Sequence, residues 1–308
     1  MKNKNLFYWA CEKSENSGEG KLALIFIRGL KKKFKLFEIK KPNIKYKILK
    51  KLFNYKYILP FIGVIYCWKY FFKNRKVCYI NYLPFWNFLI FLTLPPNTRI
   101  GPITGGAKFD KFSSLTRTLI FPIFYKISEV IVNLRNFSLI FSTDLLREFL
   151  SKKTLKKSTF NYVIKAFFFK KKKYKKKIDF IIYYREHKNK KKFFPFKLIQ
   201  NLLIKGFNIN VVGDKIKIPN IKNKGYLKNK GYLKNKDLLK LQKKAKFTIS
   251  SNENLYSLFT LECIINNVFV VLAKSQNYKI PFFKERFIKI NFNDTKELQK
   301  LKKIYKSN

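Results

Sequence analysis

The chain has 308 residues, which is enough for one large domain or two of ordinary size. Hydrophobic residues make up 47% and aromatic residues 18%, a composition that supplies a sizeable core and excludes an intrinsically disordered chain. The formal net charge of +51 fits an anionic partner, but the abundance of Lys, Asn, Ile, Phe and Tyr also fits a bias toward AT-rich codons. The charge alone therefore does not indicate nucleic acid, although it would attract an anionic membrane surface.

Cysteine and histidine restrict the chemistry further. None of the cysteines has a CxxC spacing and all lie in apolar runs, which predicts buried free thiols in a reducing compartment. They are Cys11, Cys67, Cys78 and Cys263. The single histidine, His187, excludes a His-rich metal site, and we expect it to be a surface residue. We expect no signal peptide, because the apolar run at residues 6–11 is short and is followed at once by Glu12.

The first half alternates short β-rich runs with longer runs of helical periodicity, which predicts βαβ units and a parallel sheet. The predicted strands are residues 6–11, 76–81, 99–104 and 138–143, and the predicted helices are residues 21–37, 84–94, 113–136 and 145–151. Two aromatic-rich stretches, 57–72 and 77–94, are long enough that each has to be tested as a membrane-spanning helix. The second contains Asn81, Pro84 and Asn87, so a strand followed by a buried helix is favoured there.

A run that is nearly all lysine, residues 170–177, repels itself and predicts a solvated linker. We therefore expect one domain at residues 1–172 and a second at 173–308. The alternation restarts after the linker, with strands at 179–184, 208–212, 247–251, 268–273 and 287–293 and helices at 193–205, 235–246, 255–266 and 294–305. A tandem copy of NKGYLK, residues 223–228 and 229–234, indicates a lengthened surface loop.

Four polar segments follow predicted strands, where open α/β sheets bind ligands. Gly18, Glu19 and Gly20 precede the first helix, where backbone N–H groups suit an anion, although a plain tight turn is an equally good interpretation. Arg185 follows the strand at 179–184; a guanidinium there suits a diphosphate, and arginine is scarce in this chain. Gly213 ends the next strand of the second half.

The third segment, residues 250–262, is a polar strand end that opens a helix. Asn254 is placed to meet sugar hydroxyls, and Glu262 lies on a largely apolar helix where a carboxylate needs a polar partner such as a ribose. The donor-binding residues predicted in this segment are Glu253, Asn254, Leu255, Tyr256, Ser257 and Glu262. The fourth segment contains Thr104, Gly105 and Gly106, which either line an acceptor cleft or form a turn that needs positive φ.

Residues 179–273 resemble the donor domain of family 4 retaining glycosyltransferases with the GT-B fold. Arg185 and Lys190 match that family's Arg and Lys pair by spacing, and Asn254 and Glu262 match its Glu-x7-Glu motif, with Asn254 in place of the first Glu. The family's Gly five residues after the second Glu is here Asn267, which tolerates a left-handed backbone.

The resemblance implies an α/β GT-B protein with two Rossmann-like domains facing each other across a cleft. It implies that Arg185 and Lys190 stabilise the leaving diphosphate, that Asn254 contacts the sugar and that Glu262 holds the ribose. The partners would be a nucleotide sugar and a glycan or lipid-linked glycan acceptor, with no cofactor, no metal and no nucleic acid. We expect a cytoplasmic enzyme of cell-surface polysaccharide biosynthesis, peripheral on the inner face of the membrane. A non-catalytic GT-B partner subunit is the alternative, since Asn254 replaces a family Glu, and a basic nucleic-acid-binding protein is less favoured because no reader motif is found.

Overall fold

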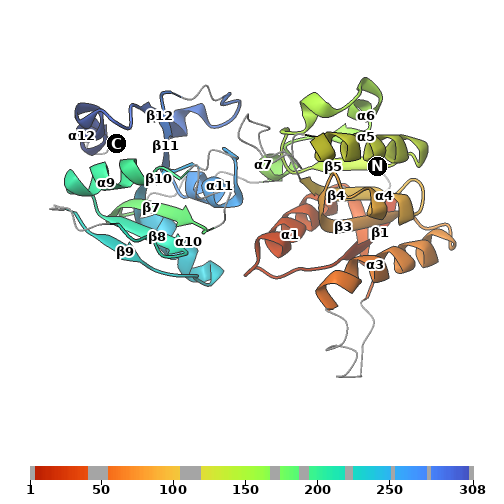
Figure 1. Ribbon diagram of the computed structural model, residues 1–308. Coiled ribbons are helices and arrows are strands. Elements are labelled where there is room, and N and C mark those ends of the chain that lie inside the picture. The colour runs from red at the N-terminus through yellow and green to blue at the C-terminus, as the bar shows by residue number, and fades with distance from the viewer. Residues whose placement is uncertain are drawn as a thin grey trace. The chain divides into compact units, whose positions relative to one another are not determined.

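The computed structural model describes residues 4–40, 55–104, 119–166, 174–186, 194–218, 225–250, 254–275 and 279–304. The chain divides into two compact units, Met1–Ala166 (unit 1) and Phe167–Asn308 (unit 2). Each unit contains one six-stranded sheet in which all neighbouring strands are parallel (Figure 1). The predicted positions Lys190, Glu253, Gly105 and Gly106 lie outside the described residues, and the expected cleft between the halves stays a prediction.

Unit 1 has the strand order β2-β1-β3-β4-β5-β6, the doubly wound order in which the chain changes direction between β1 and β3. Its strands are β1 (Lys4–Ala10), β2 (Phe34–Glu38), β3 (Val77–Pro84), β4 (Arg99–Thr104), β5 (Ser138–Phe141) and β6 (Ser158–Thr159). Its helices are α1 (Gly18–Lys31), α3 (Tyr55–Phe71), α4 (Phe88–Thr93), α5 (Phe121–Leu134), α6 (Lys152–Lys156) and α7 (Tyr162–Ala166), with a 3₁₀ turn η2 at Arg147–Phe149.

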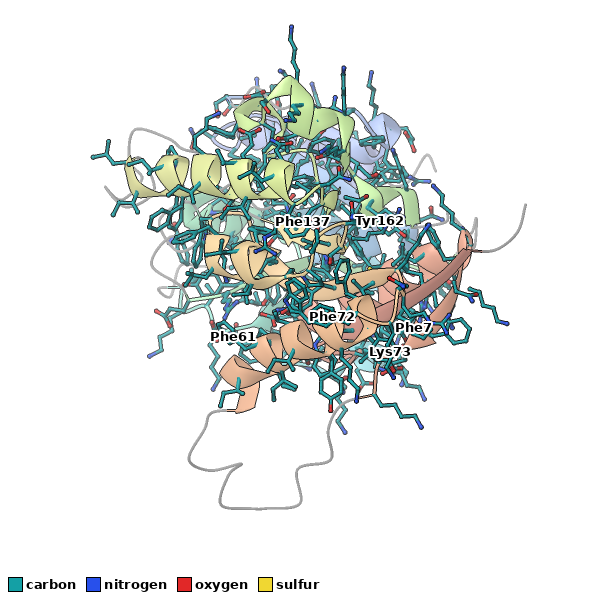
Figure 2. All side chains as sticks on the ribbon, turned by 90° about the vertical axis from the view of Figure 1, so that its right-hand side faces the viewer. Phe7, Phe61, Phe72, Lys73, Phe137 and Tyr162 are labelled. Carbon is teal, nitrogen blue, oxygen red and sulfur yellow. The ribbon has the colours of Figure 1, made fainter. Side chains whose placement is uncertain are left out.

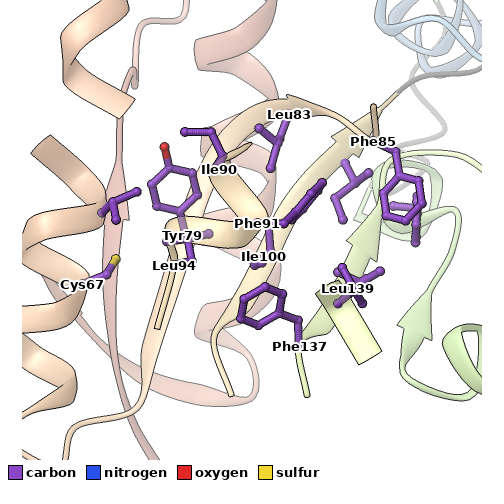
Figure 3. Packing of buried hydrophobic residues seen from close by; sticks show 14 of the residues in the cluster. Cys67, Tyr79, Leu83, Phe85, Ile90, Phe91, Leu94, Ile100, Phe137 and Leu139 are labelled. Carbon is purple, nitrogen blue, oxygen red and sulfur yellow. The ribbon is translucent and has the colours of Figure 1, made fainter. Parts of the chain in front are cut away.

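The core of unit 1 lies between the sheet and the helices α3, α4 and α5. Phe91 and Ile90 of the short helix α4, and Leu94 directly after it, are buried among strand residues such as Tyr79 and Ile100 (Figure 3). On the other side of the sheet α1 packs with α7, where the Tyr162 hydroxyl donates to the Phe26 carbonyl at 3.3 Å. Helix α1 ends six residues before the predicted end at residue 37, because residues 34–38 form the parallel strand β2 instead.

Unit 2 has the order β9-β8-β7-β10-β11-β12, the strand order 3-2-1-4-5-6 of a Rossmann fold. Its strands are β7 (Ile178–Tyr184), β8 (Ile209–Gly213), β9 (Leu227–Asn229), β10 (Ala245–Ile249), β11 (Phe269–Ala273) and β12 (Phe287–Ile290). Its helices are α9 (Phe196–Ile204), α10 (Asn235–Lys244), α11 (Leu258–Ile265) and α12 (Thr295–Ile304), with a 3₁₀ turn η3 at Lys284–Arg286. One core cluster joins α9 and α12 to the sheet, and another joins α10 and α11 to it.

Several local expectations are confirmed. Residues 77–94 form a strand and a short helix, and Gly206 and Asn267 have the left-handed backbone expected of them. All four cysteines are free thiols, and three of them are buried. Within the described ranges, no helix reaches the length and apolarity that a bilayer span requires; the 17-residue helix α3 contains Pro60.

Candidate functional site

The candidate site lies at the carboxyl ends of β7, β8 and β10 in unit 2. β7 pairs with β8 on one side and β10 on the other, so these three strand ends are neighbours. The chain reverses its direction of winding between β7 and β10, and ligands of doubly wound sheets bind outside the strand ends at this point. The residues that directly follow these strands are therefore the candidates for ligand binding.

Arg185 is the first residue after β7 and its side chain is exposed to solvent. The preceding Tyr184 is buried at 3% exposure and anchors the strand end against Phe194, with ring centroids 4.6 Å apart. Tyr183 points to the opposite face, where its ring lies 5.6 Å from that of Phe259 in the first turn of α11. The start of α11 is thus close to the strand end that carries Arg185.

Asp214 places a carboxylate close to Arg185 at this edge of the sheet. It was not predicted as a site residue. Its carboxylate accepts a hydrogen bond from the Glu186 backbone N–H at 2.6 Å and another from the Tyr232 hydroxyl at 2.8 Å. The backbone hydrogen bond from Glu186, the Tyr232 hydroxyl and the nearby Arg185 charge lower the pKa of Asp214. A carboxylate directly after a strand and a glycine was a sequence signal that could have identified it.

Gly213 places Asp214 by its backbone geometry. Its φ of 99° lies in the region that favours glycine, and a Cβ there would lie 2.2 Å from the Tyr184 carbonyl oxygen. The Asp214 N–H donates to that same oxygen at 3.0 Å. The predicted residue Gly213 is therefore required by the turn that brings Asp214 back to the end of β7, and a direct contact with a donor stays a prediction.

The described part of the tandem NKGYLK copies contains a short edge strand followed by an irregular segment. Leu227–Asn229, at the junction of the two copies, forms the edge strand β9 and pairs with β8. The second copy continues along β8, where the Gly231 carbonyl accepts from the Gly213 N–H at 3.0 Å. It also supplies the Tyr232 hydroxyl that binds Asp214. The expected loop is therefore found over residues 230–234, whereas the junction of the copies extends the sheet edge by strand pairing.

The segment after β10 reaches α11 through a polar turn. The Asn254 side-chain oxygen accepts from the Tyr256 N–H at 3.0 Å, a turn typical of Asn. Ser257 then caps the helix, its Oγ accepting from the Thr260 N–H at 3.2 Å. Helix α11 begins at Leu258, three residues later than predicted, because this cap defines its start.

Two residues of this segment that were predicted to contact a donor serve the core. The Tyr256 side chain is 8% exposed, and its hydroxyl donates to the Phe282 carbonyl at 2.8 Å and accepts from the Phe282 N–H at 3.0 Å. Leu255 packs against the buried residues Ile264, Val270 and Leu272. The fold uses both side chains, and their predicted contacts with a donor stay predictions.

Glu262 lies near the end of α11, and the protein supplies a polar partner for it. The Gln242 side-chain amide of α10 donates to a Glu262 carboxylate oxygen at 3.4 Å. Gln242 itself is fully buried. The Glu262 carboxylate therefore has a polar partner without a ribose, and its ribose role stays a prediction.

The described part of this edge combines a guanidinium with the start of a helix. Arg185 offers a forked, permanently charged donor, and the first N–H groups of α11 carry a partial positive charge. The ring contact between Tyr183 and Phe259 brings these two elements together. Such an arrangement suits a phosphate-bearing ligand, with Asp214 orienting the loop that carries Arg185.

The predicted residues of unit 1 that the structure describes lie at the carboxyl ends of its own sheet. Gly18, Glu19 and Gly20 form the first turn of α1, and Ser17 caps it by accepting from the Gly20 N–H at 2.9 Å. A Cβ on Gly20 would lie 2.3 Å from the Ser14 carbonyl oxygen, so close packing requires this glycine. Thr104 ends β4, and its carbonyl accepts from the Phe85 N–H at 3.1 Å.

A hollow of about 850 Å³ lies at the other edge of the unit 1 sheet. It is lined at the amino ends of the strands by basic and amide side chains such as Arg75, Arg99, Lys157 and Asn136. Arg99 stacks on Phe34, with its guanidinium carbon 4.6 Å from the ring centroid. Basic residues are expected where helices end, because they complement the exposed carbonyl groups, so we assign no ligand to this hollow.

The described residues contain no group of three or more His, Cys, Asp or Glu side chains placed to hold a metal. The expectation that neither a metal nor a cofactor is needed stays a prediction.

Comparisons with known proteins bear on the fold. No protein-family model matches the sequence, and no curated protein matches it significantly. Among solved structures, Anabaena HepE in complex with UDP has a TM-score of 0.53 and 11% sequence identity, covering 99% of this chain and 90% of that one. The complex of HepE with UDP and glucose has a TM-score of 0.51 and 10% identity, covering 98% and 90%. This likeness shows that the chain has the α/β GT-B fold, built from two Rossmann-like units.

Proposed function

We propose that this protein is a glycosyltransferase of the family 4 type that moves a sugar from a nucleotide-diphosphate sugar to a glycan or lipid-linked glycan, with retention. The single observation that carries the proposal is the position of Arg185, directly after the first strand of a Rossmann sheet and beside the start of α11. The structures of HepE with UDP and with UDP-glucose support a nucleotide sugar as the ligand of such a fold.

In the proposed mechanism the leaving diphosphate gains negative charge as the bond to the sugar breaks. Arg185 stabilises that charge through two N–H donors, and the first N–H groups of α11 add a partial positive charge. Lys190, by its spacing, is proposed as the second cation. Because Arg185 and Lys190 are proposed to supply the positive charge that the leaving diphosphate needs, the proposed chemistry uses no metal and no cofactor.

Asn254 and Ser257 are proposed to approach the transferred sugar, together with Glu253, and Glu262 is proposed to hold the ribose. The Asn254 side-chain oxygen already accepts the Tyr256 N–H, so its amide group is the part left to donate to a sugar hydroxyl. In unit 1, Gly18, Glu19 and Gly20 are proposed to contact the donor, and Thr104, Gly105 and Gly106 the acceptor. Cell-surface polysaccharide biosynthesis on the inner face of the membrane is the proposed setting.

A thermal-shift screen with UDP, GDP, ADP and CMP tests the donor site. A nucleotide at about 100 times its dissociation constant stabilises the folded protein by about 2.7 kcal/mol. We expect one diphosphate to raise the melting temperature of the wild type and not that of Arg185→Ala. Arg28→Ala is the matched control, because Arg28 is an exposed guanidinium on α1 of unit 1 that pairs only loosely with Glu15, at 3.7 Å. If no nucleotide stabilises a folded wild type, the proposal fails.

A non-catalytic GT-B partner subunit is the second candidate. It is favoured by Asn254, which stands where the family has a Glu and uses its side-chain oxygen in a local turn. Nucleotide binding without release of sugar from any tested donor would select this candidate. Turnover of a donor would select the enzyme.

A further inference from the structure

One face of unit 1 carries most of the large hydrophobic side chains that the described residues expose to solvent. They lie on α3, α4, α5 and the turn before α5, whereas those of unit 2 are all tyrosines. Figure 2 looks onto this face: α5 is yellow, and the orange helices α4 and α3 follow below it in that order. Soluble proteins rarely leave contiguous apolar patches open unless the patch contacts something.

Helix α5 exposes a continuous apolar stripe. Ile123, Ile127, Val130 and Leu134 recur every third or fourth residue along it, and Leu134 is 80% exposed. The opposite side of the helix faces the core with Tyr125 and its neighbours. The helix is therefore apolar on both sides, and only one of the two sides is covered by unit 1.

Helix α3 repeats this pattern on the same face. Phe61, Ile65 and Phe72 follow the same helical spacing, and Phe72 is 75% exposed. Trp68 lies in the same row, with its ring centroid 5.3 Å from that of Phe72. Its indole N–H donates to the Thr93 carbonyl at the end of α4, at 2.7 Å. This bond ties α3 to α4.

Helix α4 joins the two stripes into one surface. It exposes Leu89 and Leu92, and its Phe88 ring lies 5.3 Å from that of Phe124 on α5. The buried side of α4 fills the core below (Figure 3). The exposed apolar side chains of α3, α4 and α5 are called the apolar face below.

The helices of the apolar face carry few acids. Residues 55–104 contain no Asp or Glu, and the only acid in residues 119–136 is Glu129, which is buried and accepts from the Ser151 N–H at 2.5 Å. The exposed basic side chains Lys69 and Lys73 lie on or directly after α3, and Lys126 of α5 is exposed but pairs with Glu129 at 3.3 Å. An apolar surface whose own helices carry more lysines than acids complements a bilayer that contains anionic lipids.

We propose that the apolar face docks unit 1 onto an anionic bilayer, with its aliphatic and aromatic side chains entering the interface and its lysines contacting lipid phosphates. The proposal builds on the proposed function, since a transferase acting on a lipid-linked acceptor must reach a membrane, but it assigns a surface that the function does not specify. A second copy of this chain is a poorer occupant, because pairing two such faces would bring the same basic side chains together.

Sedimentation with vesicles tests this surface in the full chain. The vesicles are made of phosphatidylcholine alone or of phosphatidylcholine with phosphatidylglycerol. We expect wild type to bind the anionic vesicles. The variant Ile123→Gln/Val130→Gln/Leu134→Gln should lose roughly 100-fold in affinity, because three exposed apolar groups no longer enter the interface. Gln is a good helix former, so α5 should remain folded.

Charge is tested with matched double variants. Lys69→Gln/Lys73→Gln on the apolar face should weaken binding by about fivefold per lysine, roughly 30-fold together. Lys296→Gln/Lys300→Gln on α12 of unit 2 removes the same charge from an exposed helix elsewhere and should change binding less than about threefold. A loss that is equal in the two double variants would show a nonspecific charge effect and overturn the proposal.

Other results also contradict it. Wild type that fails to bind anionic vesicles, or a triple variant that binds as wild type does, would overturn the docking surface. A wild-type dimer that the triple variant abolishes would assign the face to a second copy instead. Nucleotide-dependent thermal shift is measured on the same variants, and because it reports unit 2, it separates a failure of membrane docking from a failure of the proposed function.

Discussion

Replacing Gly213 by alanine tests the backbone geometry on which the candidate site depends. The residue has a φ of 99°, and a Cβ built there lies 2.2 Å from the Tyr184 carbonyl oxygen. A left-handed backbone costs an L-residue roughly 1–2 kcal/mol, and a forced fit in a packed place costs roughly 1–3 kcal/mol more. We expect Gly213→Ala to lower the free energy of unfolding of unit 2 by about 3 kcal/mol.

Two other glycines serve as matched controls for this change. Gly231 has a φ of 66° but open space around it. Gly231→Ala should therefore lower the free energy of unfolding by about 1 kcal/mol, the cost of the left-handed backbone alone. Gly18 has nothing within 4 Å of a Cβ and no positive φ, so Gly18→Ala at the start of α1 should be neutral or stabilise by about 0.5 kcal/mol. The difference in the free energy of unfolding between Gly213→Ala and Gly231→Ala isolates the contact with the Tyr184 carbonyl.

Urea denaturation followed by two signals is the assay. The tryptophans of the chain are Trp9, Trp68 and Trp86, all in unit 1, so their fluorescence follows that unit, whereas far-ultraviolet circular dichroism follows both. Gly213→Ala should shift the dichroism transition to lower urea and leave the fluorescence transition in place. Equal losses for Gly213→Ala and Gly231→Ala would refute the reasoning, because the contact with Tyr184 would then contribute nothing.

Three further changes have defined outcomes. Ser257→Ala removes the cap that accepts the Thr260 N–H and should destabilise unit 2 by about 1 kcal/mol in urea denaturation; an unchanged midpoint would contradict the cap. Tyr256→Phe removes a hydroxyl with two bonds to the Phe282 backbone and should cost about 1–3 kcal/mol in the same assay, while nucleotide affinity stays within twofold if the side chain serves only the core. Burial lowers the pKa of Lys176 to about 8; since the unfolded lysine binds its proton more tightly, stability should rise with pH between about 8 and 10.5. Relative to Lys176→Met, the free energy of unfolding of wild type should rise by up to about 2 kcal/mol between pH 8 and 9.5. Partial exposure of the Lys176 side chain reduces this figure. A difference between the two proteins that does not change with pH would contradict the prediction.

The alternation of strands and helices was predictable because hydrophobic periodicity reports burial directly. Residues 269–273 form a short, continuous apolar strand whose central residues are buried, and such strands are found readily. Residues 34–37 were assigned to a helix because their apolar side chains continue the helical spacing of the residues before them. The segment forms a strand because it pairs with β1. Strand pairing is a tertiary property that local periodicity does not report.

The candidate site was predictable only where one residue type carries the chemistry. Arg185 was found because arginine is scarce and a strand precedes it. Asp214 was missed because its importance depends on the turn at Gly213, which returns it to the end of β7, and on Tyr232, which reaches it from the repeat. Conversely, Tyr256 was assigned to a ligand because a polar sequence surrounds it, although its hydroxyl is used by the Phe282 backbone.

The basic residues have two proposed roles. In unit 2 a single guanidinium at a strand end is proposed to bind a diphosphate. In unit 1 lysines border an apolar surface proposed to lie on a bilayer. The net charge of +51 does not distinguish these roles, but the position of each side chain in the fold does.

A crystal structure with the nucleoside diphosphate selected by thermal shift tests the central claim most directly. The account predicts diphosphate oxygens within hydrogen-bonding distance of the Arg185 guanidinium and close to the first turn of α11, at the carboxyl ends of β7 and β10. A nucleotide bound instead in the hollow at the amino-terminal edge of the unit 1 sheet, away from Arg185, would contradict the proposed donor site.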